Sequence, residues 1–312
     1  MNKGTQSLIL IFVLVSFFGC QKPLYKDSEF IMGTYVEVTS SDPRAKSIVF
    51  AEFKRLESIF NLFDEKSELS RLNAAGSLVV SSDLFNILKK TKQFYEASAG
   101  AFDVTIAPVS LIWKRAIKTR EFPKDADIKN ALSLVGFDYV YLDDSTLTVK
   151  LMKLGSQIDL GGIAKGYALD KAVEKLKEAH VLSALVNAGG NIYGLGNNNK
   201  KPWQIGIQNP RKENDVIEKI ELNDEAVATS GDYEQFFIYQ NRRYSHIIDP
   251  KTGQPADAGI ISTTVIAPDA MTADALSTTL FILGKDSGAH LLALFPGVKA
   301  RFISEDGKLH NF

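Results

Sequence analysis

The sequence predicts an α+β fold, with a mixed, mainly antiparallel sheet at its core and helices flanking the sheet. Its short β-rich runs come in pairs joined by turn residues, a pattern typical of hairpins. Amphipathic segments with apolar residues at helical spacing lie between these pairs. Runs and helical segments do not alternate one by one, as they would in a chain of parallel βαβ units. No long Ser-, Pro- or Gly-rich block interrupts residues 30–312, so we expect one compact domain there.

The composition excludes several classes of protein. The 312 residues are 45% hydrophobic and 23% charged, and 36 Lys and Arg against 37 Asp and Glu give a formal net charge of -1. These values are typical of globular proteins and lack the basic excess of nucleic-acid-binding proteins. A single cysteine excludes an internal disulfide framework and a thiolate metal cluster. We therefore expect a folded domain without a nucleic-acid partner.

The first segment of the chain has the features of an export signal. Lys3 is followed by an apolar run over residues 8–18 and then by Cys20, the only cysteine. The run is shorter than the roughly 20 apolar residues of a transmembrane helix, which favours a signal peptide over a permanent span. Residues 1–19 resemble a bacterial lipoprotein signal, after which Cys20 would carry the lipid. The alternative is a Cys that follows an ordinary export signal by chance.

This interpretation implies a location as well as an anchor. We expect an exported protein that is held on a bacterial membrane by lipid chains at Cys20 and faces the periplasm or the cell exterior. Residues 20–29 are expected to form a short tether between the anchor and the domain.

Periodicity predicts the helices and strands of the domain. Apolar residues at helical spacing predict helices over residues 45–60 and 84–95. Strands are predicted over residues 35–38, 139–142, 147–149, 203–207, 235–239 and 260–266. The turn at Asp143 and Asp144 joins the second and third of these runs and predicts a hairpin.

A glycine-rich segment at residues 157–170 is the first candidate site. The chain contains neither G-x-G-x-x-G nor G-x-x-x-x-G-K-[ST], so two common nucleotide-binding folds are excluded. The segment predicts a strand, a glycine turn and a helix that continues to Ala179. Free N–H groups at the helix start, with Gly161, Gly162 and Lys165 beside them, would suit an anion such as phosphate. The alternative is that the glycines only close a tight connection between strand and helix.

A second candidate site lies on a helix predicted over residues 270–284. Asp274 and Thr278 are four residues apart, which places a carboxylate and a hydroxyl on one helical face. Two hard oxygen ligands suit Mg²⁺, which keeps several waters and takes substrate phosphates as further ligands. The alternative is a helix-start Asp and a solvated Thr. Zinc is disfavoured, because the four His residues have no metal-ligand spacing.

A third candidate is His246, which precedes a proline-containing turn in a dense polar context. It is the best placed of the four His residues to act as a general base. A structural His at a strand end is the alternative. A hydrolase with a nucleophile elbow has no support, because G-x-S-x-G is absent.

Eight short motifs follow one another along most of the chain. They include Asp-Leu-Gly-Gly-Ile-Ala-Lys-Gly at residues 159–166, Asn-Ala-Gly-Gly-Asn at 187–191 and Ala-Asp-Ala-Leu-Ser-Thr at 273–278. The others lie at residues 32–34, 67–73, 100–103, 228–233 and 244–250. In this order they resemble the ApbE family, the FAD:protein FMN transferases. The resemblance implies an ApbE-like α+β fold and makes residues 30–312 a catalytic domain.

The resemblance also implies an activity and a set of site residues. FAD would be the substrate, bound with Mg²⁺, and FMN would pass to a Thr hydroxyl of an acceptor protein with release of AMP. Asp274, Thr278 and the backbone oxygen of Ala164 would hold the metal, so the glycine turn and the Asp/Thr helix should converge. His246 or a neighbouring carboxylate would take the proton of the Thr. FAD contacts would come from Met32, Ala101, Phe102, Asp103, Asp159, Gly161, Lys165, His246 and Ile247.

Phe63 and the acceptor complete these expectations. Phe63 stands where relatives often place an aromatic residue against the flavin-nucleotide rings; a core side chain after the first helix is the alternative. Acceptors in the family carry a Thr-containing flavinylation motif, often in electron-transport or Na⁺-pump subunits. Two other functions stay open: an FAD pyrophosphatase giving FMN and AMP, and a non-catalytic periplasmic FAD-binding lipoprotein. The intact Asp274 and Thr278 favour turnover over binding alone.

Overall fold

The computed structural model describes residues 23–212 and 215–312. The predicted signal peptide and Cys20 lie outside the described residues. Within the described part, no helix combines the length and apolar character needed to cross a bilayer.

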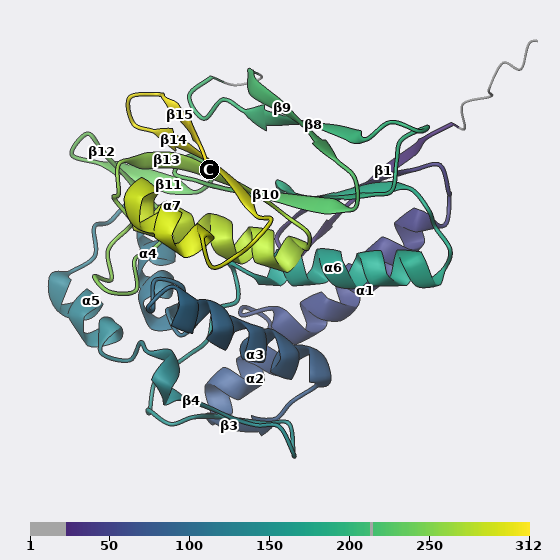
Figure 1. Ribbon diagram of the computed structural model, residues 1–312. Coiled ribbons are helices and arrows are strands. Elements are labelled where there is room, and N and C mark those ends of the chain that lie inside the picture. The colour runs from purple at the N-terminus through teal and green to yellow at the C-terminus, as the bar shows by residue number, and fades with distance from the viewer. Residues whose placement is uncertain (1–22, 213–214) are drawn as a thin grey trace, which may run out of the picture.

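An eight-stranded sheet forms the centre of the fold (Figure 1). Its strands run in the order β1-β2-β6-β7-β10-β13-β14-β15, and all neighbouring pairs are antiparallel. The predicted α+β class with a mainly antiparallel core is therefore confirmed. The strands are β1 (Tyr25–Ile31), β2 (Thr34–Ser40), β6 (Ala184–Ala188), β7 (Asn191–Leu195), β10 (Glu225–Gly231), β13 (Ile260–Ala267), β14 (Lys299–Ser304) and β15 (Leu309–Asn311).

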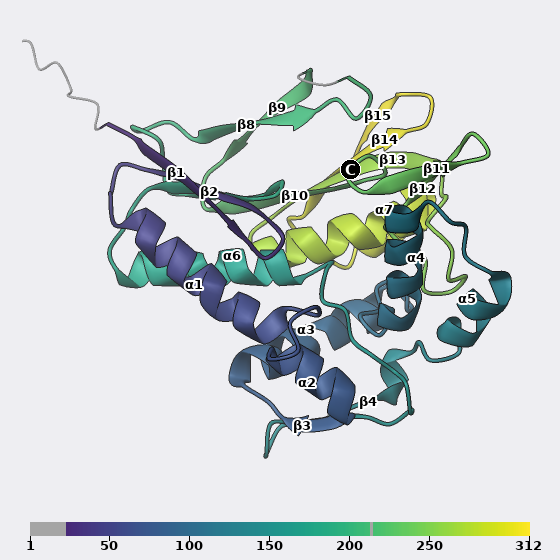
Figure 2. The same ribbon diagram turned by 180° about the vertical axis from the view of Figure 1, so that it is seen from behind.

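Three long helices cover one face of this sheet, and a hairpin covers part of the other (Figures 1 and 2). The helices are α1 (Ala45–Phe60), α6 (Ala164–Glu178) and α7 (Ala270–Leu292), and the hairpin is β8 (Trp203–Gln208) with β9 (Val216–Leu222). Val49, Phe53 and Leu56 repeat at helical spacing on α1 and are fully buried in the main core. Trp203 of β8 packs in a separate cluster on the opposite face of the sheet.

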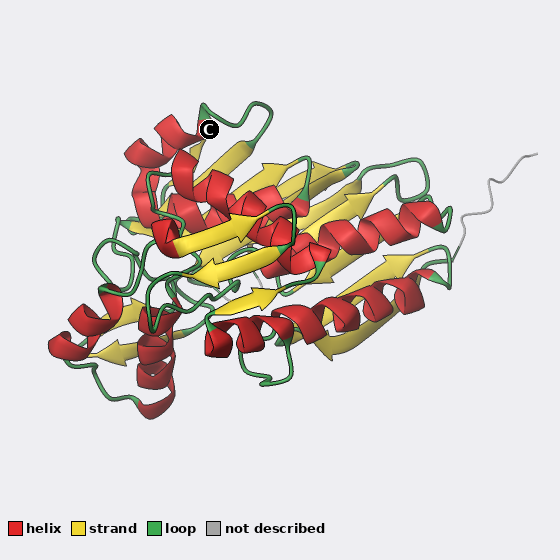
Figure 3. Cartoon of the chain, turned by 90° about the horizontal axis from the view of Figure 1, so that it is seen from below, coloured by secondary structure: helices red, strands yellow, loops and turns green. Residues whose placement is uncertain are grey.

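The remaining elements form a layer beyond the helices and a flank beside them (Figure 3). The layer holds α2 (Glu68–Ala75), α3 (Ser82–Ala97) and a small sheet of β3 (Ser77–Val79), β5 (Thr148–Leu151) and β4 (Val140–Asp143), preceded by a 3₁₀ turn η1 (Phe137–Tyr139). The flank holds α4 (Ala107–Thr119), α5 (Asp125–Leu132) and the hairpin of β11 (Phe236–Tyr239) with β12 (Arg242–Ser245). Trp113, Phe237 and Tyr244 form an aromatic core in this flank.

Most of the elements that the sequence predicted lie where it placed them. The helix predicted over residues 45–60 coincides with α1, and the one predicted over 84–95 lies within α3. The six predicted strands correspond to β2, β4, β5, β8, β11 and β13. The predicted 143–144 hairpin turn joins β4 to β5.

Two expectations need correction. Tyr25–Ile31 form an edge strand of the main sheet, so the predicted tether over residues 20–29 is wrong from Tyr25 onward. Residues 157–160 are not a strand: only Gln157 forms an isolated bridge, with Ile106. The predicted helix end at Gly284 is confirmed, because Gly284 has φ 72° and ψ -176° and breaks the helical geometry there; a second helical segment of α7 continues to Leu292.

Candidate active site

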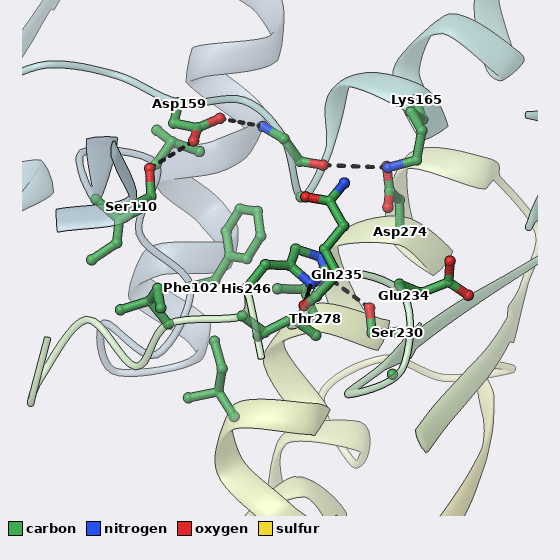
Figure 4. A pocket seen from close by; sticks show the side chains of 18 of the residues that line it. Phe102, Ser110, Asp159, Lys165, Ser230, Glu234, Gln235, His246, Asp274 and Thr278 are labelled. Carbon is green, nitrogen blue, oxygen red and sulfur yellow. Dashed lines mark hydrogen bonds between the residues drawn. The ribbon is translucent and has the colours of Figure 1, made fainter. Parts of the chain in front are cut away.

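A pocket of about 330 Å³ opens where the glycine turn, the first half of α7 and several strand ends meet (Figure 4). Its wall is built from segments far apart in the chain: the β1–β2 turn, residues 101–110, the glycine turn, the end of β10, and residues 246–250. The volume lies within the range of small-molecule sites. The three candidate sites of the sequence are therefore one site.

The glycine turn lies against α7 at this pocket. An ideal Cβ on Gly162 would be 3.3 Å from the Phe102 ring and 3.4 Å from the Thr278 hydroxyl, so the turn packs closely against both side chains. Several N–H groups of the turn are already engaged: Gly161 donates to Asp159, while Ile163 and Ala164 both donate to the carbonyl of Leu160. These three N–H groups are therefore not free, which supports the alternative that the glycines close a tight connection. The anion-binding role of the turn stays a prediction.

Asp274 and Thr278 lie side by side on α7, facing this turn. The Asp274 carboxylate is 4% exposed, and its Oδ2 accepts the N–H of Gly166 at 2.9 Å. The Thr278 hydroxyl is 3.3 Å from the hydroxyl of Ser230 on β10. Asp269, not Asp274, caps the helix by accepting the N–H of Thr272, so the helix-start alternative for Asp274 is wrong.

Two buried carboxylates hold the opposite wall. Asp159 accepts hydrogen bonds from Ser110 at 2.8 Å, Lys114 at 2.6 Å and the Gly161 N–H at 2.9 Å. Burial alone would raise the pKa of Asp159, but the Lys114 ammonium and these hydrogen bonds hold it below its usual value. Burial raises the pKa of Asp103, although Thr105 and the Phe137 N–H donate to its carboxylate.

His246 reaches the pocket from the segment after β12. Its Nδ1 is 3.1 Å from the Gln235 carbonyl. Because a carbonyl only accepts, Nδ1 carries the proton and Nε2 keeps a lone pair. Burial, with added repulsion from the ammonium groups of Lys165 and Lys114, lowers the pKa of His246 to about 4. The imidazole is therefore neutral at neutral pH and able to accept a proton.

A model of the ApbE family matches residues 32–302, which include every element that lines the pocket. The chain belongs to the ApbE family. Curated relatives share this assignment. A protein of Treponema pallidum named FAD:protein FMN transferase is 36% identical, over 91% of this chain and 86% of its own. One of the same name from Klebsiella pneumoniae is 32% identical, over 91% and 90%.

Solved ApbE structures have the same fold. The crystal structure of the ApbE protein from Thermotoga maritima matches with a TM-score of 0.85 at 35% identity, covering 92% of this chain and 96% of that one. The flavin transferase ApbE from Vibrio cholerae matches with a TM-score of 0.82 at 26% identity, covering 93% and 96%.

The structure brings most of the predicted ApbE-family site residues to this pocket. Its wall includes Met32, Ala101, Phe102, Asp103, Asp159, Gly161, Lys165, His246, Ile247, Asp274 and Thr278. Ala164 begins α6 directly after the glycine turn, with its side chain in the core. The predicted convergence of the glycine turn with the Asp/Thr helix is thus observed; the role of each residue stays a prediction.

Phe63 lies outside the pocket wall but beside it. Its ring is 71% exposed, so the core alternative is wrong for this residue. The Lys114 ammonium lies 5.3 Å from the ring centroid and also binds Asp159, which links Phe63 to the wall. An exposed aromatic ring held beside a pocket is available to stack on a flat ligand.

Sequence reasoning missed several residues of the wall: Ser110, Lys114, Asn191, Ser230, Glu234 and Gln235. Ser110 and Lys114 are four residues apart on α4, and this spacing could have indicated a shared polar face. Asn191 closes a quoted motif, yet only its burial identifies it: its Nδ2 has no hydrogen-bond partner in the described structure.

Proposed function

We propose that this chain is a Mg²⁺-dependent FAD:protein FMN transferase, which moves FMN from FAD to a Thr hydroxyl of an acceptor protein and releases AMP. The observation that carries the proposal is the meeting of the glycine turn with Asp274 and Thr278 at one pocket of an ApbE-family chain. The printed names of the curated relatives support the same activity.

The donor set at α7 fits Mg²⁺. Asp274 supplies a carboxylate, of which Oδ2 is fixed by the Gly166 N–H, and Thr278 supplies a hydroxyl. The Ala164 backbone oxygen would be the third protein ligand. Oxygen-only ligands with a single carboxylate suit an ion that retains waters and shares substrate phosphates. In the described residues no three His, Cys, Asp or Glu side chains form a metal cluster, so a site rich in such ligands has no support. When bound, Mg²⁺ would neutralise charge on the pyrophosphate.

His246 is the proposed base. Its Nδ1–H is engaged with Gln235, which orients the ring and leaves Nε2 for the acceptor hydroxyl. A pKa of about 4 makes a weak base, but the negative diphosphate of FAD would raise this pKa when it enters. Glu234, an exposed carboxylate on the same wall, is the neighbouring alternative.

The reaction exchanges a phosphoanhydride bond for a phosphoester bond. The Thr oxygen attacks the phosphorus of the FMN half of FAD, a new P–O bond forms, and the bond to the bridging oxygen breaks. AMP leaves with that oxygen, and the Thr proton passes to His246 or Glu234. Water in place of Thr would give FMN and AMP by the same steps, so the same groups also support an FAD pyrophosphatase.

The location belongs to the proposal too. The apolar run over residues 8–18 and the Cys that follows it support export and lipid attachment at Cys20. The acceptor would then be a protein exposed on the same side of the membrane, such as a subunit of an electron-transport or Na⁺-pump complex.

An assay with the purified protein tests the function. FAD is supplied with and without Mg²⁺ and with and without an acceptor domain carrying a Thr motif, and AMP release and acceptor mass are followed. We expect Mg²⁺-dependent addition of FMN to the acceptor. AMP release without labelling would instead indicate the pyrophosphatase, and tight FAD binding with neither product would indicate a binding protein.

Asp274→Ala tests the metal role. Loss of the carboxylate should reduce Mg²⁺-dependent AMP release by at least about 10²-fold while FAD still binds. Asp286→Ala is the matched control, because Asp286 lies on the same helix with its side chain 94% exposed. Unchanged AMP release in Asp274→Ala would remove the metal role from this residue.

A further inference from the structure

The main sheet has two ends with different surroundings. At one end, Tyr25 pairs with Ser40, Ser40 with Ala184, and Ala184 with Leu195, so β1, β2, β6 and β7 share this end. The chain enters the described fold here, at the start of β1 (Figure 1). At the other end, the turns after β1 and β6 carry Met32 and Gly189, which line the pocket. The N-terminal attachment and the pocket therefore lie at opposite ends of the same strands.

We propose that the first of these ends rests on an anionic bilayer and that the pocket faces away from it. The proposal rests on the N-terminal anchoring proposed above, and it adds the orientation and the contact surface. We define the basal surface as Leu24, Tyr25, Leu182, Lys200 and Lys201.

The length of chain before β1 limits how far this end can stand from the membrane. Five residue steps lead from Cys20 to Tyr25. Even fully extended they reach roughly 17 Å, about half the thickness of a bilayer. A protein lipidated at Cys20 thus keeps its basal surface close to the lipid headgroups.

The basal loops form one connected surface. The Ser40 hydroxyl donates to the Ser183 carbonyl at 2.6 Å, and the Ser183 hydroxyl donates to the Asn197 carbonyl at 2.7 Å. Arg44 donates to the Ala179 carbonyl at 3.2 Å. The loops before α1, before β6 and after β7 are therefore held together, and they would meet a bilayer as a unit.

The chemistry of this surface suits anionic headgroups. Leu182, in the loop before β6, is 82% exposed, and Leu24 and Tyr25 are 40% and 47% exposed. Lys200 and Lys201 are exposed, and no ion pair occupies either of them in the described structure. An apolar tip flanked by lysines is typical of segments that settle at a membrane interface.

Three acidic residues of this end are already engaged. Asp42 pairs with Arg44, and Glu178 pairs with Lys175. Asp224 accepts the N–H of Gly196. Among the described residues, the two lysines of the basal surface carry no ion pair and would be attracted to anionic lipid. Each lysine should raise the affinity of the protein for an anionic membrane by about fivefold.

The orientation has a consequence for the acceptor. Six residue steps along β1 separate Tyr25 from Ile31, about 20 Å of strand, and the pocket wall starts at the next residue. With the basal surface on the bilayer and the strands upright, the pocket would open about 20 Å farther out. The acceptor Thr would thus lie in a domain that stands off the membrane rather than in a segment at the headgroups.

Depth-dependent fluorescence quenching tests this orientation. The full-length chain, purified from membranes in detergent, is reconstituted in vesicles of phosphatidylcholine and phosphatidylglycerol that contain brominated lipid. A fluorophore is attached to Leu182→Cys or, as the matched control, to Leu154→Cys, which replaces a leucine that is 98% exposed in the turn after β5. Since Cys20 is the only native cysteine, lipidation of Cys20 leaves the introduced thiol as the single labelling site.

We expect at least twofold stronger quenching at position 182 than at position 154. We also expect that K200E with K201E reduces the quenching at 182, as more of the molecules tilt away from the anionic surface. Equal quenching at both sites, or stronger quenching at 154, would overturn the orientation.

Two further outcomes distinguish the failure of the membrane orientation from the failure of the N-terminal anchoring and of the transferase function. A chain that does not co-sediment with vesicles, or whose parent form is labelled at Cys20, would overturn the anchoring and the orientation together. FAD turnover by the same preparation in detergent would then show that the transferase proposal stands without them. A chain that co-sediments with the expected quenching pattern but lacks turnover would support the orientation and contradict the function.

Discussion

Asn191 holds a buried amide nitrogen that no acceptor in the described structure satisfies. A buried donor without a partner costs about 1–3 kcal/mol, and this one lies on the pocket wall, where a carbonyl or phosphate oxygen of FAD could accept it. Asn191→Leu, of similar shape, should weaken FAD binding by about tenfold and leave the ligand-free protein equally or more stable. FAD titration and thermal unfolding measure the two effects.

A neighbouring asparagine is the control for this variant. The Asn187 side chain accepts a hydrogen bond from the Gly190 N–H at 2.9 Å, so its amide stabilises the turn between β6 and β7. Asn187→Leu should therefore lower the unfolding temperature, whereas Asn191→Leu should not. Unchanged FAD affinity in Asn191→Leu would show that the amide makes no contact with the ligand.

Lys114 differs from Asn191 in that it already has a partner: its ammonium group compensates the charge of the Asp159 carboxylate. It is the cation that keeps the pKa of Asp159 low. Lys114→Met keeps the length of the side chain but leaves Asp159 unpaired, which should cost about 1–3 kcal/mol of stability and raise the pKa of that carboxyl. Turnover of the variant should then gain a new dependence on pH in the acidic range. Adding Asp159→Asn should restore most of the stability; a double variant less stable than Lys114→Met would refute the pairing argument.

At the scale of elements, α6 holds the start of α7. The helices meet so closely at Gly166 that an ideal Cβ there would be 2.3 Å from the Ala270 carbonyl oxygen. One turn later, the Asp170 carboxylate accepts the N–H groups of Ala270 and Met271 at 2.7 and 2.9 Å. These contacts fix the helix end that carries Asp274 one turn further on.

This capping carboxylate should make stability depend on pH. Burial raises the pKa of Asp170 to about 7, although the two N–H hydrogen bonds act to lower it. The negative charges of Asp269 and Glu174 raise this pKa further. The folded state then binds the proton more strongly than the unfolded state does, so the free energy of unfolding should fall as pH rises from about 4 to about 7, by at most about 4 kcal/mol. Asp170→Asn should remove this part of the decline. Urea unfolding of both proteins at pH 4.5 and 7.5 measures it, with Asp286→Asn as an exposed control; an equal decline in Asp170→Asn would exclude Asp170 as the titrating group.

At the scale of the whole molecule, β1 joins the N-terminal segment to the pocket. Two ion pairs connect β1 to α1: Asp27 with Lys46 and Glu29 with Lys54. Met32, the residue directly after β1, lines the pocket. A chain that starts at residue 24 should keep its unfolding temperature and bind FAD. A chain that starts at residue 34 should unfold about 5–10 °C lower and lose FAD binding. Circular dichroism and FAD fluorescence measure both; equal stability of the two chains would mean that β1 is a tether after all.

Local patterns determined what depends on neighbours in the chain. The apolar spacing of residues 45–60 is enough to specify α1, and the alternation around Asp143 and Asp144 specifies the hairpin of β4 and β5. The ordered motifs identified the ApbE family, because a motif is a property of sequence. Most pocket residues could be named for the same reason. Whether the N–H groups of the glycine turn are free stayed open, because it depends on Leu160 and Asp159, which sequence alone could not orient.

Only the tertiary structure decided what depends on contacts between distant segments. Residues 25–29 of β1 were expected to belong to a tether because they carry no strong signal, and pairing with β2 is what orders them. The partnership of Lys114 with Asp159, the unsatisfied amide of Asn191 and the exposure of Phe63 likewise arise where separate elements meet. Periodicity indicates which face of a segment is buried, whereas packing decides what that face contacts. The sequence therefore determined the family and the elements with a clear periodicity, and the fold determined how distant segments form the site.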